Sequence, residues 1–162
     1  MILRSAGLAL ALSAGAGAAQ DLIEWGSSDY WSVLIDPTLG NGCLIQSEFE
    51  DGSVVRIGLD RTTGFGYVTA FNEAWGDIEA GAMYPVNFAL DGEQFNGEAK
   101  GIYLNDVPGA DIEFDSVDFF MSIAQRQTMT MYNSDGGEVL SIDLTGTMAG
   151  LEAVLACQDE QG

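Results

Sequence analysis

The chain has 162 residues, of which 25 are Asp or Glu and only 5 are Lys or Arg, and with no histidine its formal net charge is −20. So acidic a protein repels phosphate backbones and anionic lipid, which argues against nucleic acid and membrane surfaces as partners. The absence of histidine also excludes Ser-His-Asp and Cys-His catalytic machinery and histidine-based zinc sites.

The first residues have the pattern of a secretory signal peptide. Arg4 precedes a short apolar run, and small residues follow it, so cleavage is expected after Ala18 or Ala19. The alternative is a short membrane anchor, but the apolar run is shorter than the roughly 20 residues of a spanning helix. We predict a signal peptide over residues 1–19 and one exported domain over residues 20–162, periplasmic or secreted, without membrane insertion.

The first strand is predicted at Trp31–Asp36, where apolar and polar residues alternate, and a hairpin follows it. A two-residue turn in this hairpin would place Val55 opposite Glu48 and mix charged with apolar side chains on one face. A three-residue loop over residues 50–52 keeps one face apolar, and Gly52 then supplies the left-handed residue. This register pairs Ser47 with Val55, Ile45 with Ile57 and Cys43 with Leu59, so Cys43 points into the core.

Five further segments have the composition of strands, and turn-forming residues separate them. They are residues 66–71, 84–90, 98–104, 128–132 and 139–144. About seven or eight short strands with hairpin-length connections predict a mainly β fold, either an antiparallel β-sandwich or a partly closed barrel.

Two short helices are predicted between and after these strands. The first covers residues 116–125, with Asp115 as its expected N-cap. The second covers residues 148–156, and its expected apolar stripe consists of Met148, Leu151 and Leu155.

Cys43 and Cys157 are the two cysteines of the chain. Export places them where disulfides persist, and two cysteines allow one intramolecular pairing. The alternative, a reactive thiol, would need a nearby histidine or basic cluster, and the local sequence shows neither. We predict a Cys43–Cys157 disulfide that fixes the terminal helix to the inner face of the sheet.

Three carboxylates, Asp111, Glu113 and Asp115, alternate with apolar residues. An extended chain would present all three on one side, and carboxylate oxygens are ligands that calcium takes. The alternative is an ordinary solvated strand, because the chain has no EF-hand spacing and Asp115 is also expected to cap a helix. Calcium at these three residues is the one cofactor that the sequence suggests.

No catalytic residues are assigned, and we do not expect an enzyme. A pair of carboxylates can carry out acid–base catalysis, as in glycosidases, but nothing in the sequence singles out two of the 25 acidic residues.

Trp75 is the candidate interface residue, because it lies between two predicted strands in the segment 72–76. An aromatic side chain on a loop can anchor a partner. The alternative is that Trp75, like Trp25, Tyr30 and Trp31, belongs to the core or covers an edge of the sheet.

Several of these segments together resemble small secreted alphaproteobacterial proteins of unassigned activity. The matching segments are Asp36–Cys43, Asp51–Gly52, Val55–Gly58, Trp75, Gly81–Tyr84, Leu144–Gly146 and Leu155–Gln158. More distantly, the export signal, short strands and closing helix resemble invasion-associated locus B proteins, which are exported β-sandwich domains linked to host-cell invasion. The resemblance implies the fold and the compartment. Its motifs are structural, so it implies no catalytic residues.

The sequence therefore favours an exported binding or envelope-associated module whose acidic surface steers it toward a basic protein. One alternative is a periplasmic inhibitor of a basic hydrolase such as lysozyme. Another is a carboxylate-based hydrolase that acts on envelope glycans.

Overall fold

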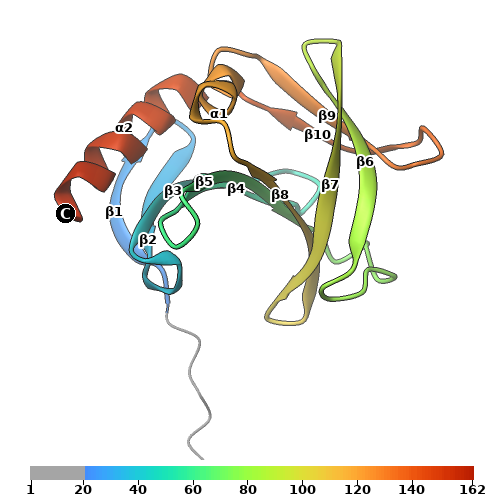
Figure 1. Ribbon diagram of the computed structural model, residues 1–162, viewed down its shortest axis with the longest axis horizontal. Helices are drawn as coiled ribbons and strands as arrows, with labels where there is room; N and C mark the ends of the chain where they lie inside the picture. The colour runs from blue at the N-terminus through green and yellow to red at the C-terminus, as the bar shows by residue number, and fades with distance from the viewer. Residues whose placement is uncertain (1–20) are drawn as a thin grey trace, which may run out of the picture.

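The computed structural model describes residues 21–162, so the predicted signal peptide lies outside the described residues. Within this range the chain forms ten strands, two α-helices and one short 3-10 helix (Figure 1). The strands are β1 (Ile23–Ser28), β2 (Trp31–Asp36), β3 (Gly42–Glu48), β4 (Val54–Asp60), β5 (Phe65–Phe71), β6 (Met83–Leu90), β7 (Glu93–Leu104), β8 (Val107–Phe114), β9 (Thr128–Tyr132) and β10 (Glu138–Asp143). The helices are η1 (Pro37–Leu39), α1 (Val117–Ile123) and α2 (Thr147–Glu160).

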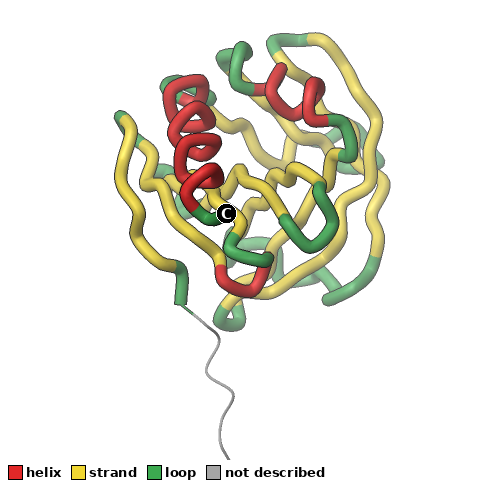
Figure 2. The backbone as a smooth tube through the Cα atoms, turned by 60° about the vertical axis from the view of Figure 1, so that its left-hand side comes forward, coloured by secondary structure: helices red, strands yellow, loops and turns green. Residues whose placement is uncertain are grey.

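All ten strands belong to one antiparallel sheet in the order β1-β2-β3-β4-β5-β8-β7-β6-β9-β10. The end strands β1 and β10 are not paired with each other, so the sheet is open. It curves strongly, and both α-helices lie on its concave side (Figures 1 and 2). The indole of Trp31 on β2 donates a hydrogen bond of 3.1 Å to the carbonyl of Thr145, just after β10, and so links the two halves of the curved sheet.

The predicted hairpin is confirmed in its register. Ile45 pairs with Ile57 and Ser47 with Val55, and Gly52 has the expected positive φ of 82°. The amide of Gly52 donates to the carbonyl of Phe49, which closes the three-residue loop. This register turns Cys43 inward, where its side chain is fully buried.

The mainly β class is confirmed, and all eight expected strands are present, but β1 and β8 were not expected. β1 is interrupted by a bulge between Glu24 and Gly26, which breaks the period of two. β8 contains Pro108 and Gly109, a pair that indicates a turn in a sequence. In the folded chain Gly109 is needed because an added Cβ would lie 2.4 Å from the Phe71 ring.

The two helices differ from the prediction in their caps and in the buried face. Ser116, not Asp115, is the N-cap of α1, and its hydroxyl accepts a hydrogen bond from the amide of Phe119. The stripe predicted for α2 is also wrong at two of its three positions, because Met148 and Leu155 are 38% and 41% exposed. The residues of α2 that are buried are Thr147, Gly150, Leu151, Val154 and Cys157.

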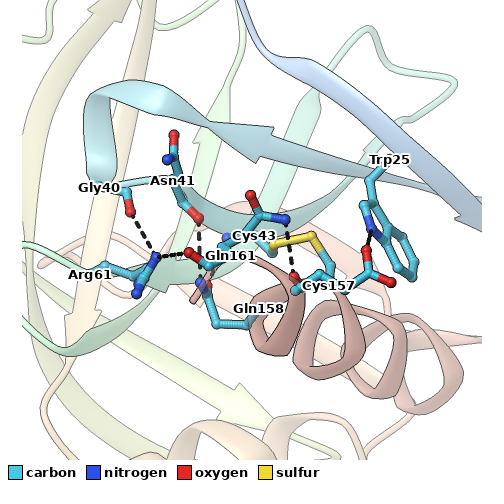
Figure 3. The surroundings of a disulfide bond; sticks show 9 residues. Trp25, Gly40, Asn41, Cys43, Arg61, Cys157, Gln158 and Gln161 are labelled. Carbon is cyan, nitrogen blue, oxygen red and sulfur yellow. Dashed lines mark hydrogen bonds between the residues drawn. A yellow bond between two sulfur atoms is a disulfide. The ribbon is translucent and has the colours of Figure 1, made fainter.

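The Cys43–Cys157 disulfide explains which face of α2 is turned toward the sheet (Figure 3). It joins β3 to the helix across 114 residues of sequence, with the two Cα atoms 6.2 Å apart. Cys157 must therefore face the sheet, and Val154 and Gly150 lie on the same side of the helix. Gly150 allows the close approach, since an added Cβ would lie only 3.1 Å from the Ile45 side chain.

Polar contacts attach the rest of the helix to the sheet. The side-chain oxygen of Gln158 accepts from the amide of Cys43 at 3.0 Å, and its nitrogen donates to the carbonyl of Asn41 at 3.3 Å. The indole of Trp25 donates to Glu160 at 2.7 Å. The helix is thus held by one covalent bond and by hydrogen bonds on both sides of it.

Replacing both cysteines, as Cys43→Ala with Cys157→Ala, should lower the free energy of unfolding by about 2–5 kcal/mol, because the bond closes a long loop in the unfolded chain. Urea denaturation of the oxidised protein and of the variant measures the difference. Wild-type protein unfolded in the presence of reductant is the matched control and should resemble the variant. Equal urea midpoints for the oxidised protein and the variant would contradict a stabilising role.

Candidate functional site

The segment between β5 and β6, residues 72–82, carries the predicted interface residue. It begins with a turn in which the Asn72 side chain accepts from the amide of Ala74 at 2.8 Å. The amide of Trp75 donates to the carbonyl of Asn72, and that of Ile78 to the carbonyl of Trp75. Consecutive turns of this kind give the segment a defined shape without regular secondary structure.

The end of the same segment is fastened to β7. The amide of Gly81 donates to the carbonyl of Gly101, and the amide of Gly101 donates to the carbonyl of Ala82, both at 2.8 Å. Gly101 is required there, because an added Cβ would lie 2.1 Å from the carbonyl oxygen of Glu79. The hydroxyl of Tyr103 also donates to the carbonyl of Ile78 at 2.5 Å.

Between this segment and the sheet lies a cavity of about 420 Å³, which we call the Trp75 pocket. Its lining comes from six parts of the chain: Ala74–Ile78 of the segment, Tyr84–Val86 of β6, Ala99 of β7, Ala110 of β8, Met131–Ser134 at the end of β9, and Val139 of β10. Most of the lining is apolar, as is usual for ligand-binding cavities.

The Trp75 pocket lies on the concave side of the sheet. Val86 is on the same face of β6 as the buried Phe88, and Ala110 is on the same face of β8 as the buried Ile112. Farther along these strands the concave face is filled by a cluster of four aromatic rings, Phe88, Phe95, Phe114 and Phe119, the last of them from α1. At the other end, neither of the two α-helices of residues 21–162 lines the cavity, and the small side chains of Ala99 and Ala110 leave space above the sheet.

Trp75 itself is half-buried and packs against the core cluster, so it is neither a free surface aromatic nor a fully buried one. Among residues 21–162 no acceptor is placed for its indole N–H, whereas the indoles of Trp25 and Trp31 both have one. An aromatic wall with an unused donor is suited to a bound group.

The rim of the Trp75 pocket is acidic. Asp77 lines it, Glu73 and Glu79 are exposed on the same segment, and Glu138 begins the strand that contributes Val139. None of the four Lys and Arg side chains in the described part of the chain lines the pocket. The site therefore combines an apolar interior with an uncompensated negative border.

The three carboxylates considered for calcium lie together on the opposite, convex face. Asp111, Glu113 and Asp115 line a second hollow of about 430 Å³ with Glu98 and Lys100, which we call the Asp111 hollow. One oxygen of Asp111 accepts from the hydroxyl of Thr69 at 2.5 Å, and Lys100 is its cross-strand partner. Within the described residues no group of three or more acidic side chains is placed to hold a metal ion, so this hollow gives calcium no ligand set.

Sequence reasoning singled out Trp75 but missed the residues that form the cavity with it. Ile78 and Tyr84 are separated in the sequence by a turn-rich stretch, so nothing indicates that they share a cavity. Val139 has the pattern of an ordinary strand residue. The one signal was an aromatic residue in a connection too long for a hairpin. Nothing local indicates that this connection folds back over the sheet.

The comparisons with known proteins bear on the fold. No family model matches the chain, and no curated protein sequence matches it significantly. Among solved structures, the chain resembles invasion associated protein B from Bartonella henselae, with a TM-score of 0.55 and 16% sequence identity over 86% of this chain and 99% of that one. The resemblance to invasion-associated locus B proteins is thus confirmed at the level of the fold.

Trp75→Ala should lower the free energy of unfolding by about 2 kcal/mol, less than the about 3–5 kcal/mol expected when a fully buried Trp is truncated. The reason is that one side of Trp75 faces an open cavity, whereas Trp31 is 2% exposed. Urea denaturation of Trp75→Ala beside Trp31→Ala measures both. Equal losses would make Trp75 a core residue and remove it as a binding residue.

Asp111→Asn should stabilise the protein at neutral pH. Burial raises the pKa of Asp111 above its ordinary value of 3.8, although the Thr69 hydrogen bond opposes this shift. The folded state therefore keeps the proton to higher pH than the unfolded chain, and stability falls as the pH rises through that window. Asparagine has no charge to desolvate and still accepts from Thr69.

The measurement is the urea midpoint of both proteins between the ordinary pKa and neutrality. Their difference should grow with pH and vanish at the acidic end. Glu152→Gln, on the exposed side of α2, is the matched control and should not change the pH profile. A constant difference at every pH would contradict the assignment.

Proposed function

We propose that this protein is an exported, non-catalytic binding module of the cell envelope whose Trp75 pocket receives an apolar group adjacent to a cationic one on a partner protein. One observation carries the proposal: an apolar cavity has an indole in its wall, and its lining includes the carboxylate of Asp77 but no Lys or Arg. An apolar group gains from burial in the cavity, and only a neighbouring cation also gains from the rim.

The expected energies are sufficient for specific recognition. An aromatic side chain buries about 150–250 Å² when it is enclosed, and each Å² of apolar area contributes about 25 cal/mol. The exposed acids add less per contact, because water and salt screen them. They nevertheless speed the approach of a basic partner and make association sensitive to salt.

The disulfide and the fold support the envelope location. A disulfide between buried cysteines persists in an oxidising compartment such as the periplasm. The described helices include none that is long and apolar enough to cross a membrane. The structural neighbour from Bartonella is named for invasion, and for this chain we propose only an envelope-associated role of the same general kind.

Two alternatives concern the nature of the partner and the possibility of catalysis. A basic hydrolase such as lysozyme has the charge that the rim prefers, so an inhibitor is a special case of the proposal. A glycan hydrolase needs two carboxylates in one hollow, and the Asp111 hollow, which Glu98, Asp111, Glu113 and Asp115 line, is one candidate. Binding is favoured over that activity because Asp111 already accepts a hydrogen bond from Thr69 and pairs across the strands with Lys100.

The test compares three small probes that share one ring: tryptamine, indole and indole-3-acetate. Tryptamine should bind best and indole-3-acetate worst. Each step should be about fivefold, since an exposed charge pair contributes at most about 1 kcal/mol. Titration followed by NMR of the protein amides gives both the affinities and the location, and added salt should reduce the differences among the probes.

Trp75→Ala should abolish binding of all three probes. Trp25→Ala is the matched control, because it removes another half-buried indole that lies against α2, away from the pocket. Equal affinities for the three probes, or binding that survives Trp75→Ala, would refute the proposed site. Inhibition of a basic muramidase that disappears with Trp75→Ala would assign the partner to basic hydrolases.

A further inference from the structure

The outer edge of β10 is free. β10 pairs only with β9, and the amide of Leu144 donates to the carbonyl of Gln127 at the end of this pair. In an antiparallel pair the hydrogen-bonded positions alternate, so Ile142 and Leu140 also bond toward β9. The amides and carbonyls of Ser141 and Asp143 therefore point away from the sheet. Within residues 21–162 no group from outside the β9–β10 pair bonds to them.

This edge runs between two hollows. Val139, near its start, lines the Trp75 pocket. Asp143, at its end, lines another hollow of about 400 Å³, which we call the Tyr30 hollow. The other residues of the Tyr30 hollow are Tyr30, Trp31, Ser47–Glu50 and Thr145. A strand rises about 3.4 Å per residue, so the four steps from Val139 to Asp143 cover about 14 Å, and a segment of about seven residues reaches both hollows.

The charge along this path is negative throughout. Glu138 and Asp143 lie on the strand itself, Asp77 lies at the Trp75 pocket, and Glu48 and Glu50 line the Tyr30 hollow. No Lys or Arg of the described chain lines either hollow. A second copy of this chain paired along β10 would bring Glu138 and Asp143 close to the same acids, which is unfavourable. The occupant that the charges select is a basic segment of another protein.

The opposite edge of the sheet lacks these properties. β1 is bent by its bulge between Glu24 and Gly26, and its Trp25 side chain is bonded to α2. A bulge and a covering helix are ways in which proteins keep an edge strand from pairing. β10 has a bulge only at its start, between Glu138 and Leu140, and its remaining residues are regular.

We propose that an extended, basic segment of the partner adds to the free edge of β10 as an eleventh strand, with an apolar side chain in the Trp75 pocket and its other end at the Tyr30 hollow. This inference rests on the proposed function and specifies how the partner is bound. The backbone hydrogen bonds of Ser141 and Asp143 would give affinity, and the two hollows would select side chains.

The probe is the capped heptapeptide Lys-Val-Lys-Trp-Lys-Val-Lys, whose side chains alternate between basic and apolar as a strand requires. It should bind more tightly than tryptamine, because backbone hydrogen bonds add to the contact of the ring. The same peptide with Glu in place of each Lys is the control for charge and should not bind. Two N-methylated versions, each blocking one alternate set of backbone amides, test for strand pairing: one should bind like the parent and the other should not bind.

On the protein side, Ser141→Pro removes an outward amide and places a ring where the added strand would lie. Proline is tolerated on an edge strand when its N–H is not used in the ladder, so the fold should survive. The affinity for the heptapeptide should fall about tenfold or more. This is the loss expected when a hydrogen bond that contributes up to about 1.5 kcal/mol is removed. Ser141→Thr keeps the amide and is the matched control. Tryptamine binding should be the same in all three proteins.

The outcomes separate the two proposals. If tryptamine binds in the Trp75 pocket, but both N-methylated peptides bind like the parent and Ser141→Pro has no effect, strand addition is wrong and the pocket stands. If tryptamine binds but the heptapeptide does not, strand addition is also wrong. If tryptamine itself does not bind, the proposed function fails first. Because the N-methylated peptides leave the protein unchanged, the test holds even if Ser141→Pro does not fold.

Discussion

An open, curved sheet of ten strands has a concave face that must be kept from water, and the bond between Cys43 and Cys157 decides how one half of it is covered. The bond fixes the distance between α2 and β3 and also the rotation of the helix, because Cys157 has to face Cys43. With that rotation set, Gly150 comes against Ile45 and Leu151 and Val154 enter the core. Met148 and Leu155, although apolar, are left toward solvent.

The other half of the concave face is covered by different means. α1 is short and places Phe120 against Gly66, where an added Cβ would be 2.5 Å from the ring. It closes the middle of the sheet and does not extend to the start of β6. There the segment of residues 72–82 lies over the sheet, and its end is held by hydrogen bonds to Gly101. A loop covers a sheet less completely than a helix does, and the space left under it is the Trp75 pocket.

How much of this could be predicted from the sequence depends on the range of the interactions involved. The hairpin of β3 and β4 was predictable in its register, because a local alternation and one glycine determine it. The disulfide was predictable because the chain has two cysteines. The rotation of α2 was predictable only through that disulfide, because hydrophobicity along the helix favours Leu155 whereas a bond from Cys157 to Cys43 turns Val154 toward the sheet.

The site illustrates the same limit. Trp75 could be singled out as an aromatic residue in a long connection, but its partners come from β6, β7, β8, β9 and β10, and no local pattern brings these strands together. Asp111, Glu113 and Asp115 could be predicted to share one side of the chain because alternation is local. That they lie on the opposite face from the Trp75 pocket could not be predicted, because it depends on Ala110, the neighbour of Asp111 on β8, lining that pocket.

The acidity of the chain gains a structural meaning from the free edge of β10. An unpaired, regular strand invites association with another copy of the same protein, and charged side chains are a common protection against this. Glu138 and Asp143 lie on that strand, and Glu48 and Glu50 lie beside its end. Like charges would meet if two copies paired there, whereas a basic segment would neutralise them. The same side chains that oppose self-association at this edge thus favour a basic partner.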